Sequence, residues 1–308
     1  MQHLPVLADE IVKAIQPKSG QVVLDGTVGY GGHAKLLLAS AHGPFTYIGL
    51  DRDEKALAHC QSLFAGQENV HVAHANYAEA PAVLANLGID KLDAVLLDLG
   101  ASSPQFDQPQ RGFSFQFSGP LDMRFDQSAG NTAAEVLNTY KEQDLARVIR
   151  DYGEERFAKR IAKKIVERRR EQPFTETLHL VEVVEQAIPR KSWPRSIHPA
   201  TRTFQALRIE VNNELELLKQ ALPQLILLLK PGGRIAVISF HSLEDRIVKQ
   251  TFKKATLTCV CPPEFIICTC KTTPQLSLVH KKPIVATDEE QKQNPRSRSA
   301  KLRIAQKV

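Results

Sequence analysis

Short apolar runs alternate with segments of helical spacing over about the first hundred residues of the chain. The runs at Val22–Leu24, Tyr47–Leu50, Val70–Val72 and Leu92–Leu97 have the length of strands. The last of them is continuously apolar apart from Asp93, which is typical of a parallel strand covered on both faces. Segments with apolar residues three and four apart, such as Glu54–Phe64 and Ala78–Leu87, predict the intervening helices. This alternation predicts an α/β fold with a parallel sheet.

The alternation stops near Gln105 and helical spacing dominates the next hundred or so residues. The helices that the spacing predicts there are Ala133–Asn138, Gln143–Tyr152, Glu154–Gln172 and Leu178–Ile188. We therefore expect a cofactor-binding α/β domain formed by residues 1–106 and 206–308, with a helical domain inserted at residues 107–205.

The strand pattern returns in the last third of the chain. A long helical stretch, Thr203–Leu229, is expected to be interrupted at Pro223, and Lys230–Gly233 is expected to form a turn. Arg234–Ser239 predicts another buried strand, followed by a helix capped by Ser242. A final strand is expected after the basic loop that begins at Asn294.

A glycine-rich segment between the first strand and its helix carries the main candidate chemistry. It begins at Asp25 and continues as Gly-Thr-Val-Gly-Tyr-Gly-Gly-His33. Glycines allow a left-handed backbone and close approach of a ligand, and the N-terminus of the following helix offers N–H groups to an anion. The spacing also fits a dinucleotide fingerprint, with Asp51 about 20 residues downstream. A dinucleotide-dependent oxidoreductase is therefore one hypothesis.

Acidic residues at three predicted strand ends favour a different cofactor. Asp25 precedes the glycines, where it would repel a pyrophosphate but attract the ammonium and sulfonium groups of S-adenosylmethionine. Asp51 ends the second strand, where its two oxygens could accept hydrogen bonds from both ribose hydroxyls. Asp98 ends the buried strand, and the carboxyl ends of parallel strands share one crevice. Together these acids favour S-adenosylmethionine.

The net charge and the basic segments of the chain indicate a candidate binding partner. The net charge is +6 and the sequence pI is about 9.0, which favours a polyanion. Between Arg190 and Arg208 there are five basic residues, no acids and the single Trp193, a combination that suits an RNA backbone and a stacked base. A second basic set lies in the longest predicted helix: Arg156, Lys159, Arg160, Lys163, Lys164, Arg168, Arg169 and Arg170. A non-catalytic RNA-binding assembly factor is thus another hypothesis, although it has no need of three strand-end acids.

The small number of cysteines and the hydropathy of the chain indicate the cellular compartment of the protein. No segment approaches the ~18 apolar residues of a membrane span, the N-terminus resembles no secretory signal, and five cysteines are few for this length. We expect a cytoplasmic protein that does not associate with a membrane. Cys60 is expected in the core. The other four form two Cys-x-Cys pairs that could bind zinc or remain thiols: Cys259, Cys261, Cys268 and Cys270.

Several long motifs resemble the RsmH (MraW) family, and the resemblance covers essentially the whole chain. Besides the glycine loop and Asp51-Arg-Asp53, they are Asp98–Gln105, Arg111–Phe115, Leu121–Arg124, His198–Arg208, Ser239–Arg246 and Asn294–Arg303. The resemblance implies a class I S-adenosylmethionine-dependent methyltransferase, with a Rossmann-like doubly wound sheet and an inserted helical domain for substrate RNA. It also implies methylation of N4 of a cytidine at the decoding centre of 16S ribosomal RNA, either as free RNA or in the small ribosomal subunit. The cofactor contacts that it implies fall on Gly31, Gly32, His33, Asp51, Asp98 and Gln105, with Tyr77 as the aromatic after the third strand.

The implied reaction is a direct displacement by a weakly nucleophilic amine. The lone pair of the cytosine amine is delocalised into the ring, so the protein must orient N4 and accept hydrogen bonds from it. Asp98, Ser102, Ser103 and His241 are the candidate catalytic residues. Methylation at C5 would require a cysteine nucleophile, and neither 98–105 nor 239–246 contains one.

Overall fold

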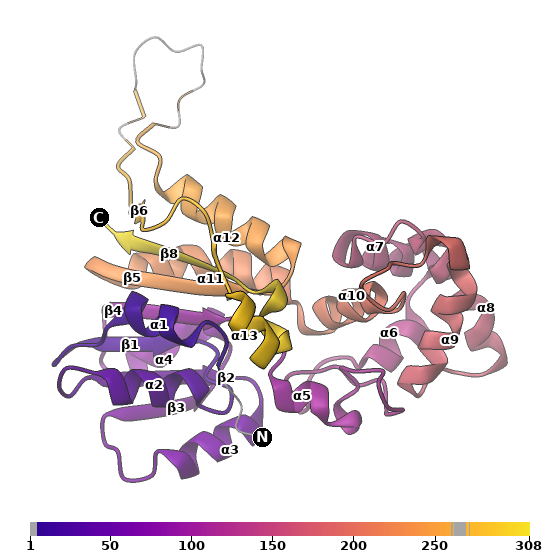
Figure 1. Ribbon diagram of the computed structural model, residues 1–308, viewed down its shortest axis with the longest axis horizontal. Helices are drawn as coiled ribbons and strands as arrows, with labels where there is room; N and C mark the ends of the chain where they lie inside the picture. Colours follow the sequence, from indigo (N-terminus) through magenta and orange to yellow (C-terminus); the bar gives the residue numbers. More distant parts are fainter. Residues whose placement is uncertain (1–4, 260, 262–268, 271) are drawn as a thin grey trace. The chain divides into compact units, whose positions relative to one another are not determined.

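The computed structural model describes residues 5–259, 261, 269–270 and 272–308 (Figure 1). The chain divides into two compact units: residues 1–100 with 215–308, here called the sheet unit, and residues 101–214, here called the helical unit. The helical unit corresponds to the insertion expected at 107–205, but it begins earlier and ends later, so that Ser102, Ser103 and Gln105 belong to it.

The sheet unit contains one mainly parallel sheet, formed by eight strands among the described residues, in the order β3-β2-β1-β4-β5-β8-β6 with β7 also paired to β8. Strands β1 to β5 are parallel, and β8 is antiparallel to its neighbours β5, β6 and β7. Their bounds are β1 Val22–Asp25, β2 Thr46–Asp51, β3 Val70–His74, β4 Leu92–Asp98, β5 Leu229–Ser239, β6 Leu276–Leu278, β7 Ile284–Val285 and β8 Lys301–Lys307.

Side chains alternate between two cores, one on each face of this sheet. Val23 and Leu96 belong to the core that contains Ala34 of α2 and Leu57 of α3. Leu24 and Leu97 point the other way, into a core that contains helices α4, α11 and α12. The helices of the sheet unit are α1 Ala8–Ile15, α2 Gly32–Ser40, α3 Glu54–Leu63, η1 Tyr77–Glu79, α4 Ala80–Asn86, α11 Glu214–Leu228, α12 Ser242–Ala255, α13 Asp288–Gln293 and η4 Pro295–Ser299.

The helical unit has its own apolar core, which includes Ile161 and Ile165 of its basic helix. Its helices are α5 Ser103–Asp107, η2 Pro109–Arg111, α6 Ala133–Thr139, α7 Glu142–Gly153, α8 Ala158–Glu171, α9 Thr177–Ala187, η3 Arg190–Ser192 and α10 Thr201–Asn212. In the described part of the chain, no helix combines the length and the apolar character needed to cross a membrane.

Three local predictions were wrong. The helical stretch from Thr203 breaks at Asn213, which has φ of 51°, and not at Pro223, which lies inside α11. Pro223 and Lys219 are both exposed, so the Lys219 carbonyl, which has no helical N–H partner at Pro223, lies on the exposed side of the helix. The expected turn at Lys230–Gly233 lies within β5, where Gly232 has φ of 81°. The N-cap of α12 is His241 rather than Ser242.

Candidate functional site

Three acids end three adjacent strands of the sheet unit. Asp25 ends β1, Asp51 ends β2 and Asp98 ends β4, and β1 lies between the other two. Because all three strands are parallel, these acids lie at the same edge of the sheet. This edge also receives the glycine segment that connects β1 to α2.

Asp25 is buried and is held by donors of the protein itself. Its Oδ2 accepts a hydrogen bond from the Tyr47 hydroxyl at 2.6 Å, and its Oδ1 accepts from the Thr27 backbone N–H at 3.0 Å. Burial raises the pKa of Asp25, while the hydrogen bond from Tyr47 acts in the opposite direction. The structure therefore gives Asp25 a direct role in fixing the start of the glycine segment.

The glycines meet two different requirements. Gly29 and Gly31 have φ of 51° and 76°, a region that glycine occupies without strain. Gly26 has no room for a side chain, since a Cβ there would lie 2.6 Å from Leu97 and 2.7 Å from Tyr77. A Cβ on Gly32 would meet Pro5 at 3.0 Å.

Asp51 ties the second strand to the glycine segment and keeps acceptor capacity. One carboxylate oxygen accepts from the Gly29 N–H at 2.7 Å and the other from the Asp53 N–H at 2.9 Å. A carboxylate oxygen has about two acceptor sites. Burial raises the pKa of Asp51 to about 6, although these hydrogen bonds act to lower it, and the residue remains half-buried. Asp51 can therefore still accept hydrogen bonds from a ligand.

His33 and Asp98 form the part of this edge where hydrogen-bonding capacity is unused. His33 lies in the first turn of α2, is 6% exposed, and its Nε2 is 3.5 Å from Asp98 Oδ2. Among the described residues, neither ring nitrogen of His33 nor Asp98 Oδ1 has a well-formed hydrogen bond, although all three atoms are buried. Burial acts to lower the pKa of His33, but the carboxylates of Asp98 and Asp25 outweigh it and raise the pKa.

Tyr77 and His241 also belong to the sheet unit. Tyr77 begins η1, which two residues separate from the end of β3, and packs beside Gly26. His241 caps α12, with its Nε2 3.1 Å from Glu244 Oε1. Glu244 in turn accepts a hydrogen bond from the Phe240 N–H at 2.9 Å. The His241 ring is therefore oriented by the helix that it caps.

Ser102, Ser103 and Gln105 lie in the helical unit, at the start of α5. Gln105 Oε1 accepts a hydrogen bond from the Ser102 N–H at 2.9 Å, which is the reciprocal half of a capping box. Gln105 and Ser103 are 4% and 7% exposed. The Gln105 side chain thus already stabilises the turn that follows β4.

Most of the basic residues of α8 are exposed, but Arg169 has a structural role. Its guanidinium donates to the backbone carbonyls of Leu137 and Tyr140, both at 2.7 Å, and so caps the C-terminus of α6. Trp193, expected to stack on a base, donates from Nε1 to the Ile188 carbonyl at 3.0 Å and lies under the Arg190 guanidinium. The exposed basic residues of α8 are Lys159, Arg160, Lys163, Lys164 and Arg170.

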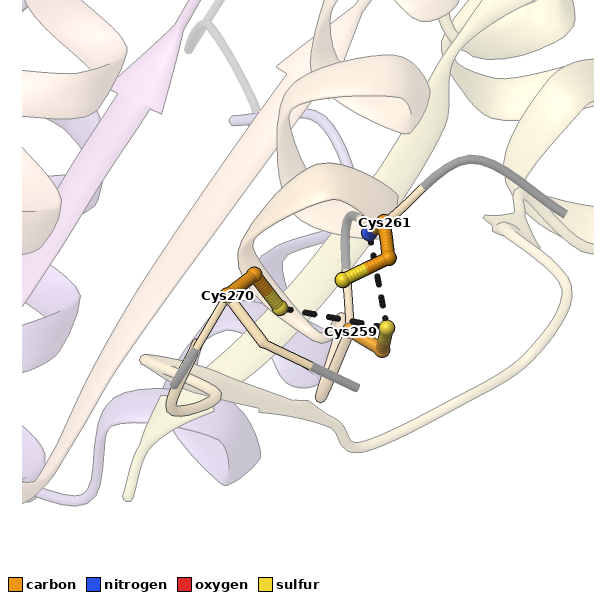
Figure 2. Close-up of side chains that lie close together, drawn as sticks. All are labelled: Cys259, Cys261 and Cys270. Carbon is orange, nitrogen blue, oxygen red and sulfur yellow. Dashed lines mark hydrogen bonds between the residues drawn. The ribbon is translucent and has the colours of Figure 1, made fainter. Parts of the chain in front are cut away.

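The cysteines separate into two kinds. Cys60 is in the core, donates to the Gly29 carbonyl at 3.1 Å, and its pKa is raised by burial to about 12, which confirms its expected place in the core. The sulfur atoms of Cys259, Cys261 and Cys270 lie within 4.8 Å of one another (Figure 2). Cys268, the fourth residue of the predicted zinc set, lies outside the described residues.

Two residues that position this site were missed from the sequence. Tyr47 looks like one more apolar residue of a strand, yet its hydroxyl binds Asp25. Thr27 accepts a hydrogen bond from the Asp98 N–H at 2.6 Å through its hydroxyl, which links the glycine segment to β4. The signal that could have identified Tyr47 is its hydroxyl, a polar group on a predicted buried strand that pairs with the strand ending at Asp25.

This sheet order, with an antiparallel strand near one edge and acids at the ends of β1, β2 and β4, defines a class I methyltransferase fold. The whole chain, residues 1–308, matches the MraW methylase family, and the protein therefore belongs to that family of methyltransferases.

Individual relatives are similar over nearly their full length, and each is named Ribosomal RNA small subunit methyltransferase H. The protein of Geobacter sp. (strain M21) is 52% identical over 99% of this chain and 98% of its own. The protein of Syntrophotalea carbinolica is 49% identical over 100% of this chain and 98% of its own. The protein of Heliobacterium modesticaldum is 47% identical over 99% of this chain and 98% of its own.

Proposed function

We propose that this protein transfers a methyl group from S-adenosylmethionine to the exocyclic N4 of a cytidine at the decoding centre of 16S ribosomal RNA. The observation that carries the proposal is the row of strand-end acids around a glycine segment, in a chain that matches a methylase family over its whole length. The names of its relatives support the small ribosomal subunit as the source of the RNA.

The sheet unit fits this cofactor. His33 and Asp98 Oδ1 bring buried polar atoms without well-formed hydrogen bonds to the edge where a ligand would supply partners. Asp51 retains acceptor capacity for ribose hydroxyls. Gly31 and Gly32 form the N-terminus of α2, where backbone N–H groups can be offered to a ligand. When bound, S-adenosylmethionine supplies an electrophilic methyl group on a sulfonium. Tyr77 would contact the adenine, and Gln105 is a further candidate for a cofactor contact.

Asp25 acts in this proposal through charge and position. Both of its oxygens already accept hydrogen bonds from Tyr47 or Thr27, and the residue is 1% exposed. Direct contact with a ligand is therefore a smaller part of its role than holding the glycine segment and contributing negative potential.

The protein must also promote attack on the methyl group by the cytosine amine, which is a poor nucleophile. An acceptor near N4 stabilises the positive charge that develops on the amine as the new C–N bond forms, and it takes up the proton released. Asp98 is the first candidate, because its Oδ1 is a buried acceptor not already engaged by a well-formed hydrogen bond in the described structure. His241, Ser102 and Ser103 are candidates for orienting the base, which must be turned out of the RNA to reach the site.

The basic helix α8 and the segment Arg190–Arg208 are proposed to hold the RNA backbone. Ile161 and Ile165 face the core of the helical unit, while Lys159, Arg160 and Lys163 are exposed on the same helix. Membership of a methylase family argues against both alternative functions considered from the sequence, a dinucleotide-dependent oxidoreductase and a non-catalytic RNA-binding factor.

The test is methyl transfer in vitro, followed by identification of the modified nucleoside. Small ribosomal subunits and free 16S RNA are incubated with labelled S-adenosylmethionine, and the RNA is digested and analysed by mass spectrometry. We expect N4-methylcytidine as the product. A product methylated at C5, or labelled protein with unmodified RNA, would contradict the proposal.

A pair of variants on one strand sharpens this test. Asp98→Asn should lower the rate of transfer strongly, since it removes the anionic acceptor. Asp93→Asn is the matched control, because Asp93 lies near the opposite end of β4 and accepts from the Val22 N–H and Lys230 Nζ, both at 2.8 Å. It should retain the rate of transfer in folded protein.

A further inference from the structure

The connection between α12 and β6 brings three thiols together outside the proposed methyltransferase site. Its two ends are joined, since the Gln275 N–H donates to the Ala255 carbonyl at 2.8 Å. Cys259 and Cys261 follow the first end, and Cys270 precedes the second. Their three sulfur atoms all lie within 4.8 Å of one another (Figure 2).

Packing does not account for this cluster. Buried cysteines behave as small apolar residues, and Cys60 is such a case, with its thiol at 0% exposure in the core. Cys259 is exposed, and Cys261 and Cys270 are half-buried. Neither of the apolar cores of the sheet unit contains these three residues. Their convergence therefore calls for a chemical explanation.

The distance between two of the sulfur atoms fits a shared metal ion and does not fit a disulfide. The Cys270 thiol donates a hydrogen bond to the Cys259 sulfur at 3.8 Å, whereas a disulfide bond is about 2.05 Å long. Two thiolates on tetrahedral zinc, each at about 2.3 Å from the metal, lie roughly 3.8 Å from each other.

We propose that Cys259, Cys261 and Cys270 bind one zinc ion as thiolates and so fix the connection between α12 and β6. Three thiol protons are released when the three sulfur–zinc bonds form, and no redox step is involved. Thiolate ligands in a tetrahedral arrangement select zinc over hard cations such as magnesium. The site has a structural role, because it holds residues 259 and 270 together across the loop that they enclose.

Two of the three sulfur atoms accept local hydrogen bonds from the protein. The Cys261 N–H donates to the Cys259 sulfur at 3.4 Å, and the Thr272 hydroxyl donates to the Cys270 sulfur at 3.1 Å. Hydrogen bonds of this kind to sulfur are the usual surroundings of thiolate ligands.

The experiment measures metal content directly on the full chain. Protein prepared under reducing conditions with zinc supplied should contain about one zinc per chain by elemental analysis. After removal of zinc with a chelator, Co²⁺ should restore one metal per chain and give a thiolate-to-cobalt charge-transfer absorption. Metal-free protein that also shows no such absorption with Co²⁺ would overturn the proposal.

Matched substitutions assign the ligands. Cys259→Ser and Cys270→Ser should each lower the zinc content well below one per chain, whereas Cys60→Ala should leave it unchanged. If full zinc content persists in both serine variants, the metal is bound elsewhere and the proposal is wrong. Binding of S-adenosylmethionine by each variant reports that the sheet unit is folded, so that metal loss is not confused with unfolding.

Discussion

Asp51 is the residue whose ionisation should control cofactor binding. Asp51→Asn should weaken binding of S-adenosylmethionine by about tenfold to a hundredfold, since hydrogen bonds to a charged acceptor contribute roughly 1.5–3 kcal/mol. Isothermal calorimetry measures the change. Asp53→Asn is the matched control, because Asp53 caps α3 by accepting from the Lys55 N–H and asparagine is an equally good cap. An unchanged dissociation constant in folded Asp51→Asn protein would reject the assignment to ribose.

The pKa of Asp51 gives this prediction a pH dependence of known sign. Because the pKa is raised to about 6, affinity for the cofactor should fall as the pH drops through 6, by up to about tenfold per unit. The asparagine variant should lack this dependence. Stability changes in the opposite direction: folded, ligand-free protein binds this proton more tightly than the unfolded chain, so the contribution of Asp51 is lost as the pH rises from about 4 through 6.

The acids at the strand ends could be predicted, because both the strands and the acids are visible in the sequence. The side chains that form hydrogen bonds with this part of the site could not be predicted in the same way. Tyr47 is far from Asp25 in the sequence, and the register that brings Tyr47 opposite Val23 is fixed by pairing between β1 and β2. Likewise, Thr27 resembles an ordinary turn residue until β4 is placed beside β1. Side-chain partners across a sheet depend on register, which local patterns do not contain.

Helix ends show the same limit at the scale of elements. Pro223 suggested a break, but its missing N–H is tolerated on the exposed face of α11. The break occurs at Asn213, because asparagine tolerates the left-handed conformation that ends α10. His241 caps α12 although serine is the commoner cap, because Glu244 binds the backbone N–H groups of Phe240 and His241. Local backbone conformation and short-range hydrogen bonds therefore placed these helix ends at residues other than the ones that the sequence pattern had favoured.

Arg169 joins two helices, and its loss should destabilise the helical unit. Arg169→Ala removes the donors to the Leu137 and Tyr140 carbonyls at the end of α6, so the free energy of unfolding should fall by about 1–3 kcal/mol. Chemical denaturation followed by circular dichroism measures this. Arg170→Ala, at an exposed neighbouring position, is the control and should change stability by less than about 0.5 kcal/mol. Equal stability of the two variants would show that the cap contributes nothing.

At the scale of the whole molecule, the proposed function assigns the cofactor to the sheet unit and the RNA backbone to the helical unit. The salt dependence of binding can distinguish these two roles. Each phosphate contact with single-stranded RNA contributes about 0.7 to the slope of log affinity against log salt concentration. The exposed residues Lys159, Arg160, Lys163 and Lys164 of α8 are therefore expected to account for up to about three units of that slope.

Changing these four residues to glutamine should weaken RNA binding at low salt and lower the salt slope, while the affinity for S-adenosylmethionine stays the same. Arg169 is left intact, because its loss would damage α6. The control changes Lys249, Lys253 and Lys254, which are exposed on α12 of the sheet unit, and it should leave the slope unaltered. If the α8 variant keeps both its RNA affinity and its slope, this helix is a solvated surface. The RNA contacts would then have to come from Arg190–Arg208 or from the loop that carries Arg296 and Arg298.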